Sequence, residues 1–308
     1  MSKNLATLIG FSAILLWSTL VGLLKNLSSL LGADYAVTLM YSFSTLILLA
    51  IFKIPKLSEI PKKYLIGASL LFLVYELCFS YAIALAKTAQ QAIEISLVNY
   101  LWPSLTVVML ILFKELKFSI FVVLGLVISM SGIVLIQTGN GALTWIEISA
   151  HFMSNPISYI LAFMGALLWA IYCVVTKKYS QGHNPIALYF LMISIVLWAK
   201  LLFKYSLEEL PPLNMDVAPY LAGVSLATAL GYAAWNIGII KGNITILVTL
   251  SYFSPIFSTV FSMIILKTTL SLEFWHGVIF VTLGSFICWI STSWEHIKPR
   301  IRKLKILF

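Results

Sequence analysis

Charged side chains are scarce in this 308-residue sequence, where Asp, Glu, Lys and Arg make up only 10% of the residues against 61% hydrophobic ones. A soluble protein of this length needs many more polar side chains to cover its surface. The mean hydropathy of +1.00 agrees with that shortage. The composition therefore excludes a water-soluble globular protein and predicts that lipid surrounds most of the chain.

Cysteine and histidine are also rare, with three and four residues respectively. Cys78, Cys173 and Cys288 lie far apart in apolar stretches, so we interpret them as core residues and expect neither a disulfide framework nor a metal site. The sequence contains no zinc-protease, P-loop or serine-hydrolase motif. We therefore predict no enzymatic activity, no bound metal and no cofactor.

Long apolar stretches are what the sequence has in abundance. A transmembrane helix needs about 20 mainly apolar residues, and polar breaks divide the chain into ten stretches of that kind. They are predicted near residues 5–24, 36–52, 64–86, 91–113, 118–137, 157–176, 186–204, 217–240, 244–266 and 274–293. The predicted fold class is an all-α membrane protein with ten transmembrane helices.

The distribution of positive charge predicts the orientation of these helices. A net charge of +9 would suggest a nucleic acid partner in a soluble protein, but here the basic residues lie at the predicted helix ends. Fifteen of the 20 Lys and Arg residues fall on the side of the N-terminus, including the basic tail 294–308. The other five are Lys25, Lys87, Lys200, Lys204 and Lys267. Because positive charge concentrates in cytoplasmic segments, we expect both termini in the cytoplasm and no nucleic acid partner.

An internal repeat appears when the chain is aligned with itself at an offset of 152 residues. The offset pairs Leu16-Trp17 with Leu168-Trp169, Tyr100 with Tyr252, Pro103 with Pro255, Gly125 with Gly277 and Gly132 with Gly284. It predicts a first repeat at 1–137, a connecting loop at 138–156 and a second repeat at 157–293. Because each repeat holds five helices, the second must enter the membrane from the opposite side. Two inverted five-helix repeats are typical of transporters.

Two prolines lie inside predicted helices at matching places in the two repeats, and they are candidates for helix kinks that act in gating. Pro103 and Pro255 each leave a carbonyl one turn earlier without its helical donor, which bends a helix. The neighbouring polar side chains Asn99 and Ser251 favour a cavity wall over a simple kink.

Aromatic residues near the middle of predicted helices are the next candidates. Trp17 and Trp169 occupy matching positions at central depth, whereas membrane tryptophans usually lie at the interface. Helix packing is the alternative to a cavity-lining role. Tyr81 and Tyr232, with Trp235 nearby, could stack on a ring or bond its substituents, and lipid-facing positions are the alternative for them.

Two carboxylates fall within predicted helices, where an unpaired charge is costly. Glu76 lies in the middle of its helix, and we expect it either to recognise a substrate amine or to carry a proton. Glu94 lies near the start of its helix, and we expect it to reach the membrane interface, with a proton relay as the alternative.

Several stretches resemble one transporter superfamily over essentially the full chain. Leu15-Leu16-Trp17-Ser18-Thr19, its echo Leu168-Trp169-Ala170, and Asn99-Tyr100-Leu101-Trp102-Pro103 are similar to motifs of the drug/metabolite transporter superfamily, in its EamA-type branch. Within that branch they resemble the bacterial aromatic amino acid exporters. The resemblance implies a bacterial inner membrane protein that exports aromatic amino acids and related small amphipathic metabolites. It also implies that the residues lining the central cavity include Tyr81, Tyr100, Trp102, Pro103, Trp169, Ser251 and Pro255.

The expected mechanism is alternating access, in which helix bundles rock about Pro103 and Pro255 around a central cavity. The alternative is a broad-specificity drug/metabolite efflux carrier with proton coupling, for which Glu76 would be the counter-charge. The partners expected are the small-molecule substrate and the lipid bilayer, with a monomer as the simplest assembly.

Overall fold

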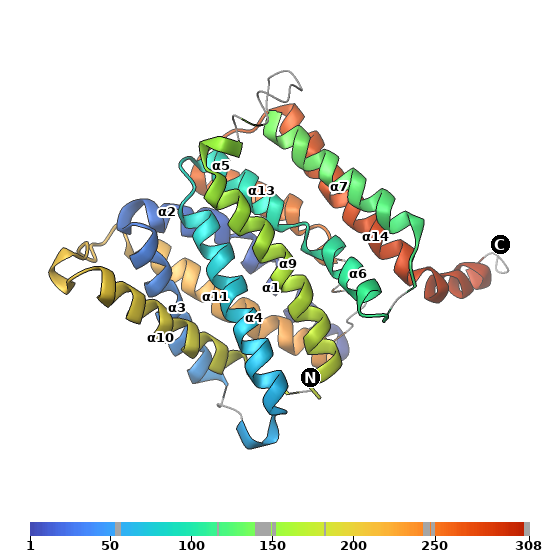
Figure 1. Ribbon diagram of the computed structural model, residues 1–308, viewed down its shortest axis with the longest axis horizontal. Helices are drawn as coiled ribbons and strands as arrows, with labels where there is room; N and C mark the ends of the chain where they lie inside the picture. The colour runs from blue at the N-terminus through green and yellow to red at the C-terminus, as the bar shows by residue number, and fades with distance from the viewer. Residues whose placement is uncertain are drawn as a thin grey trace.

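The computed structural model describes residues 1–52, 57–115, 117–138, 152–181, 183–242 and 250–304, together with Ser149 and Leu247. Its long elements within these ranges are all α-helices, and no strand occurs among the described residues (Figure 1). The first half contains α1 (Lys3–Ser18), α2 (Leu20–Leu31), α3 (Ala33–Ile51), α4 (Lys62–Ala84), α5 (Ala89–Asn99), α6 (Trp102–Leu112) and α7 (Ile120–Thr138). The second half contains α9 (Pro156–Tyr179), α10 (Ile186–Lys204), α11 (Ala218–Lys241), α13 (Ser254–Leu266) and α14 (Leu272–Leu304).

Six helical stretches among the described residues are long and apolar enough to cross a membrane. They are Lys3–Leu31, Ala33–Ile51, Lys62–Ala84, Ala89–Leu112, Pro156–Thr176 and Ile186–Lys204, and shorter apolar helices lie at Ile120–Ile136, Ser254–Leu266 and Leu272–Cys288. The predicted all-α class is confirmed. Most of the predicted connecting loop 138–156, the first residues of the span predicted at 244–266 and the side chains of the basic tail 294–308 lie outside the described part of the chain.

The first predicted span is two helices, because the backbone breaks at Thr19. The Thr19 hydroxyl donates to the Leu16 carbonyl at 2.7 Å, and the Thr19 backbone N–H donates to the same oxygen at 3.1 Å. A threonine that bonds back to a carbonyl of the preceding turn bends a helix. This break lies two residues after Trp17 and was not predicted from the sequence.

The breaks at the two prolines lie where the sequence predicts kinks. Helix α5 ends at Asn99 and α6 begins at Trp102, with Pro103 in its first turn. Helix α13 likewise begins at Ser254 with Pro255 in its first turn. A proline has no N–H to donate to the carbonyl four residues before it, so each helix starts anew at this point.

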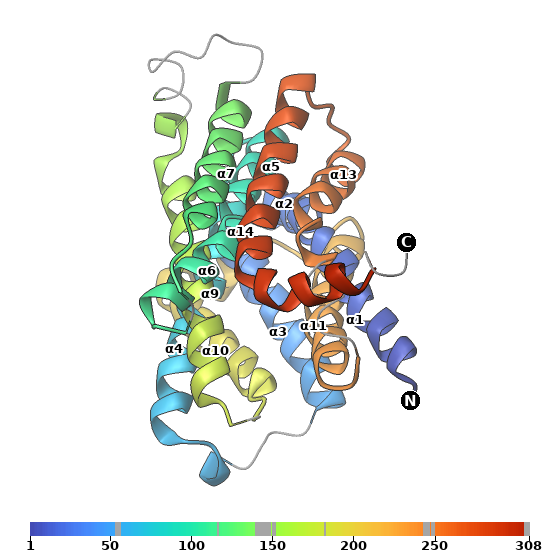
Figure 2. The ribbon, with the colours of Figure 1, turned by 90° about the vertical axis from the view of Figure 1, so that its right-hand side faces the viewer.

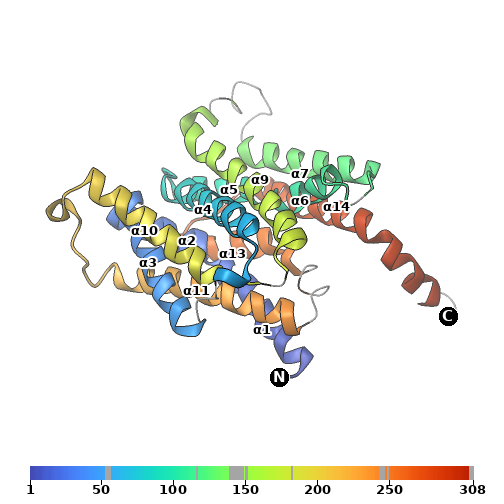
Figure 3. The ribbon, with the colours of Figure 1, turned by 60° about the horizontal axis from the view of Figure 1, so that its bottom comes forward.

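Helices of one half pack mainly on helices of the other half. Helix α1 packs on α11, α9 packs on α4, α3 packs on α10 and α7 packs on α14. The α3–α10 pair and the α7–α14 pair lie on opposite sides of the group formed by α1, α4, α9 and α11 (Figures 1 and 3). This arrangement leaves the middle of the bundle to be lined by side chains from both halves.

Four glycines bring α7 and α14 into close contact, as the two adjacent ribbons in Figure 2 show. A Cβ added at Gly125 would lie 2.6 Å from the Gly284 carbonyl oxygen, and one added at Gly132 would lie 2.6 Å from the Gly277 oxygen. Small residues allow helix backbones to approach closely in membranes, where van der Waals packing and interhelical hydrogen bonds hold helices together. The α7–α14 contact therefore depends on the absence of side chains at these positions.

Substituting alanine at Gly132 is expected to destabilise the protein. The new Cβ would also lie 2.7 Å from the Val281 backbone nitrogen, so the two backbones must move apart. Overpacking of this kind costs about 1–3 kcal/mol, which a lower Tm of the detergent-solubilised protein would report. The control is Gly67→Ala in α4, where nothing lies within 4 Å of the added Cβ. Equal Tm values for the two variants would contradict the prediction.

The expectation that Glu94 reaches the membrane interface is wrong. Glu94 is only 1% exposed. Its carboxylate accepts hydrogen bonds from the Tyr159 hydroxyl and the Gln90 side-chain amide, each at 2.9 Å. Polar groups from α9 and from the preceding turn take the place of water around the carboxylate. Local position along the helix does not show this, because Tyr159 is 65 residues away in the chain.

Candidate functional site

A cavity of about 110 Å³ lies between the two halves. Residues from α1 to α6, from α9 and α11, and from the 251–254 segment line it. Its lining is dominated by aromatic rings, with few polar groups: Ile14, Trp17, Leu20, Leu24, Met40, Tyr41, Tyr75, Glu76, Phe79, Ser80, Asn99, Tyr100, Trp102, Trp169, Thr228, Tyr232, Trp235, Ser251 and Ser254. An aromatic cavity with a few convergent polar groups is typical of a small-molecule site.

Eight of the nine residues predicted to bind substrate line this central cavity. They are Trp17, Glu76, Asn99, Tyr100, Trp102, Trp169, Tyr232 and Ser251. The two predicted kink prolines directly follow lining residues in the chain, since Pro103 follows Trp102 and Pro255 follows Ser254. The structure therefore brings together residues that are up to 234 positions apart, while their role in binding stays a prediction.

Trp17 forms one aromatic wall of the cavity with two rings of α11. Its ring centroid lies 5.1 Å from that of Tyr232, edge to face, and 5.5 Å from that of Trp235. Gly231 provides the space for the indole, since a Cβ at this position would lie only 2.5 Å from Trp17 Nε1. The position of Trp17 thus depends on a glycine in α11.

Trp169 of α9 forms a second aromatic wall of the cavity. Its ring lies 4.6 Å from Tyr75, 5.2 Å from Tyr172 in a stacked arrangement, and 6.3 Å from Trp102 at nearly right angles. Offset and edge-to-face contacts of this kind are the favourable aromatic geometries. The cluster joins α4, α6 and α9, so the ring of Trp169 is held by helices from both halves.

Glu76 is the carboxylate of the cavity. It is 4% exposed, and it accepts hydrogen bonds from the Tyr41 hydroxyl at 2.5 Å and from the Tyr232 hydroxyl. The Tyr41 hydroxyl also lies 2.9 Å from the Ser80 hydroxyl. Within the described residues Glu76 forms no ion pair. A carboxylate with only neutral partners at this depth suits a cationic ligand group or a proton.

Asn99 fixes the end of α5 against α9. Its side-chain amide donates to the Ala162 carbonyl at 3.1 Å, and the residue is 5% exposed. Gly165 leaves room for this amide, because a Cβ there would lie 3.1 Å from Asn99 Nδ2. The break before Pro103 is therefore anchored to the second half of the chain.

Several lining residues were not predicted from the sequence, of which Tyr41 and Tyr75 matter most. Tyr41 lies in an unusually polar part of its helix, beside Ser42, Ser44 and Thr45. Tyr75 directly precedes Glu76. The polar neighbours of Tyr41 and the position of Tyr75 beside Glu76 can both be seen in the sequence. Neither feature shows which side of the helix faces the cavity.

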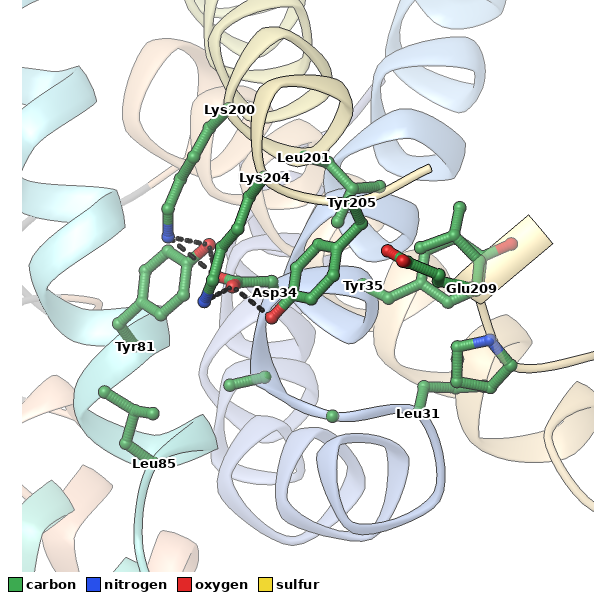
Figure 4. A pocket seen from close by; sticks show the side chains of 14 residues that line it. Leu31, Asp34, Tyr35, Tyr81, Leu85, Lys200, Leu201, Lys204, Tyr205 and Glu209 are labelled. Carbon is green, nitrogen blue, oxygen red and sulfur yellow. Dashed lines mark hydrogen bonds and ion pairs between the residues drawn. The ribbon is translucent and has the colours of Figure 1, made fainter. Parts of the chain in front are cut away.

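Tyr81 is the predicted site residue that lies elsewhere. It lines a second, larger pocket of about 540 Å³ with Asp34, Lys200 and Lys204 (Figure 4). The Tyr81 hydroxyl donates to Asp34 Oδ1 at 2.8 Å, which turns the ring away from Glu76. Tyr81 is five residues after Glu76, so the two side chains lie more than one turn apart on the same helix.

An all-helical bundle of membrane-length apolar helices around an aromatic cavity with a buried carboxylate belongs to the class of multi-pass membrane transporters. The comparisons with known proteins agree. The EamA-like transporter family model matches residues 156–290. The chain is 40% identical over 294 residues to the aromatic amino acid exporter YddG of Salmonella typhimurium, covering 95% of this chain and 99% of that protein.

Further relatives carry the same name. The chain is 41% identical to YddG of Escherichia coli, with the same coverage, and 28% identical to YddG of Ancylobacter novellus over 84% of this chain and 88% of the other. One solved structure, titled "Crystal structure of protein", has a TM-score of 0.65 at 21% identity, covering 94% of this chain and 99% of that one, and so shares the fold. This chain belongs to the EamA-like transporter family and is a transporter, not an enzyme.

Proposed function

We propose that this protein exports aromatic amino acids and related small amphipathic metabolites across the bacterial inner membrane, through the central cavity between its halves. The observation that carries the proposal is the pairing of aromatic walls with a single buried carboxylate in one cavity. The names of the relatives support the same substrate class.

The aromatic ring of the substrate is assigned to the space between the Trp17 and Trp169 walls. Tyr100 and Trp102, on the two sides of the α5–α6 break, complete the apolar surroundings. Stacked and edge-to-face ring contacts contribute about 0.5–1.5 kcal/mol each beyond the burial of apolar area. A ring is therefore preferred over an alkyl side chain of similar size.

The amino group of the substrate is assigned to Glu76. A substrate ammonium beside this carboxylate would supply the positive charge that the cavity lacks among its described residues. Asn99 and Ser251 are the polar groups assigned to the rest of the amino acid backbone. This arrangement uses the amine-recognition interpretation of Glu76, and proton binding is the competing one.

The cavity is too small for its substrate in the present conformation. Its volume of about 110 Å³ is well below the range of about 300–1,000 Å³ that ligand pockets of proteins occupy. Substrate binding thus requires the walls to separate. We assign that movement to the helix breaks at Pro103 and Pro255, which let the two ends of each interrupted helix move separately, and the result is alternating access.

Two inverted five-helix repeats, at 1–137 and 157–293, explain the helix pairing. At the offset of 152, α7 is the equivalent of α14. Gly125 faces Gly284 and Gly132 faces Gly277, so these equivalent helices run antiparallel. Ser42 and Ser194, also 152 residues apart, lie 3.2 Å from each other across the α3–α10 pair. Each contact is what a two-fold axis within the membrane plane would produce.

The orientation proposed places both termini in the cytoplasm, on the side that carries 15 of the 20 basic residues. The pocket around Asp34 then lies at the outer end of the bundle. We propose that one chain is the transporting unit, because its two halves together line the central cavity.

Proteoliposomes loaded with radiolabelled phenylalanine, tryptophan or alanine test the proposed function. Selective efflux of the two aromatic amino acids supports it, and equal rates with and without a pH gradient identify a facilitator. Acceleration by the gradient assigns a proton to the transport cycle. Efflux of the lipophilic cation tetraphenylphosphonium without efflux of aromatic amino acids would favour the broad-specificity carrier instead.

Substituting alanine at Gly231 is expected to reduce phenylalanine efflux at least about tenfold, the effect of roughly 1.4 kcal/mol on transition-state or substrate binding. The added Cβ would displace the indole of Trp17 from its place against α11, toward the cavity. Gly223→Ala in the same helix is the control, because only the flexible end of Leu23 lies near its Cβ, at 3.3 Å. Equal efflux by the two variants would contradict a role for the Trp17 position.

A further inference from the structure

The pocket around Asp34, the outer pocket, has a volume suited to a ligand. Its approximate 540 Å³ falls within the range of about 300–1,000 Å³ for ligand pockets. The ends of α2, α4 and α10 and the start of α3 form it. Figure 4 shows both lysine side chains converging on Asp34 from α10.

Asp34 has no acceptor capacity left for a ligand. Its Oδ1 accepts from Lys200 at 2.6 Å and from the Tyr81 hydroxyl at 2.8 Å. Its Oδ2 accepts from Lys204 at 2.9 Å and from the Tyr205 hydroxyl at 3.3 Å. A carboxylate offers about four lone-pair sites, and four donors occupy them. Its side chain is only 14% exposed.

The two lysines do keep donors for a ligand. Each ammonium carries three N–H donors. Lys200 uses two of them, on Asp34 and the Tyr81 hydroxyl. Lys204 uses one on Asp34, and its ammonium lies 4.9 Å from the centroid of the Tyr205 ring. Their side chains are 48% and 55% exposed. The two ammonium groups therefore offer positively charged N–H donors to the pocket, and such donors suit a carboxylate.

The rest of the outer pocket is apolar and aromatic. Tyr35, Tyr205 and Pro211 line it together with four leucines, which are Leu31, Leu85, Leu201 and Leu210. Glu209, the other acidic residue of the lining, accepts a hydrogen bond from the Ser206 backbone N–H at 3.1 Å. The surroundings thus suit a molecule that combines a carboxylate with a ring or an alkyl body.

The outer pocket and the central cavity share two helices. On α4, Tyr81 follows Glu76 by five residues, and on α3, Asp34 precedes Tyr41 by seven. At a rise of about 1.5 Å per residue these separations are roughly 7 and 10 Å along the helices. A substrate leaving the cavity toward the outer end would therefore pass the lysines next.

We propose that the outer pocket is a second substrate site, in which the carboxylate of the exported aromatic amino acid binds Lys200 and Lys204 in place of Asp34. This inference rests on the proposed export function. Asp34 is the internal competitor: it holds the lysines when the site is empty, and the arriving carboxylate exchanges with it. The exchange breaks the ion pairs that tie α3 to α10, and so joins substrate release to separation of these helices.

Binding of radiolabelled 3-phenylpropionate to the purified full-length protein tests the proposal, because this probe has the ring and the carboxylate but no ammonium for Glu76. The variant K200Q/K204Q is expected to bind the probe at least about tenfold more weakly, because it lacks the charge-assisted hydrogen bonds from the two lysines to the carboxylate. The control K267Q removes another exposed lysine near the outer end and should leave the affinity unchanged. Phenylalanine should displace the probe, and phenethylamine, which lacks the carboxylate, should not.

The substitution Asp34→Asn tests whether the ion pairs of Asp34 with the two lysines belong to a ligand site or are a purely structural cross-link. Loss of the competing carboxylate is expected to tighten 3-phenylpropionate binding about tenfold, by removing an interaction of roughly 1.4 kcal/mol. A structural cross-link predicts that D34N and K200Q/K204Q change affinity in the same direction, and this result would overturn the proposal. The Tm of each variant identifies unfolding, and single Lys200→Gln replaces the double variant if that one does not fold.

Failure of this inference is distinct from failure of the proposed function. Normal phenylalanine efflux with probe binding that does not depend on the lysines overturns the outer site alone. Lysine-dependent probe binding that phenylalanine cannot displace also overturns it, because the site would then take other organic acids. Absence of aromatic efflux from proteoliposomes overturns the export function, whatever the probe does.

Discussion

Phenylalanine efflux is expected to be lost when Trp169 is replaced by alanine, while the variant still inserts into the membrane. The indole contacts Tyr75, Tyr172 and Trp102, so its removal opens one whole wall of the cavity. Truncation of a central aromatic anchor typically costs 2 kcal/mol or more, which is roughly 30-fold in affinity. Radiolabelled efflux from proteoliposomes, normalised to the amount of reconstituted protein, measures the effect.

Two further variants are controls for that result. Trp275→Ala removes a half-buried indole of α14 outside the cavity, so it should lower stability without abolishing efflux. Trp169→Phe keeps a ring and should restore part of the activity. We expect Tyr100→Ala to behave like Trp169→Ala, and normal efflux by both alanine variants would rule out the proposed aromatic site.

Glu76→Gln is expected to reduce phenylalanine efflux by a factor of about 10 to 150, the range that corresponds to a hydrogen bond of 1.5–3 kcal/mol to a charged group. Glutamine keeps the size of the side chain and one oxygen that can accept from Tyr41 or Tyr232, so the local packing is preserved. Only the negative charge is removed. Initial rates over a range of phenylalanine concentrations give kcat/KM for both proteins.

The substrate analogue 3-phenylpropionate distinguishes the two interpretations of Glu76. If the carboxylate binds the ammonium, E76Q should lose its discrimination in favour of phenylalanine over this analogue. If Glu76 instead carries a proton, E76Q should lose its response to a pH gradient and keep its selectivity. Glu94→Gln, at another buried glutamate outside the cavity, is the matched control and should alter neither property.

Most of the candidate site could be predicted because its residues are unusual for their place in the chain. Tryptophan and glutamate are uncommon at the middle of a membrane helix, and Trp17, Trp169 and Glu76 all line the cavity. A proline inside an apolar run also has a local consequence, and the helices do break before Pro103 and Pro255. Each of these signals can be interpreted without knowing what lies opposite.

Other features escaped the sequence because they depend on contacts between distant segments. Tyr41 and Tyr232 both bond to Glu76, yet Tyr232 is 156 residues away from it in the chain. The same holds for Asp34 and Lys200, which are 166 residues apart and form the pair that draws Tyr81 into the outer pocket. A hydroxyl or a lysine in the sequence carries no information about its partner.

The sequence by itself determined that this is a helical membrane protein, that it contains apolar stretches of membrane length, and which of its aromatic and acidic residues were candidates for a site. These properties follow from composition, from the length of apolar runs and from residue types at helix centres, all of which are local. Only the tertiary structure decided that the helix breaks at Thr19, that Glu94 is buried and that Tyr81 belongs to the outer pocket. The physical reason is that side-chain direction and hydrogen-bond satisfaction depend on the helix packed opposite, and that helix comes from the other half of the chain.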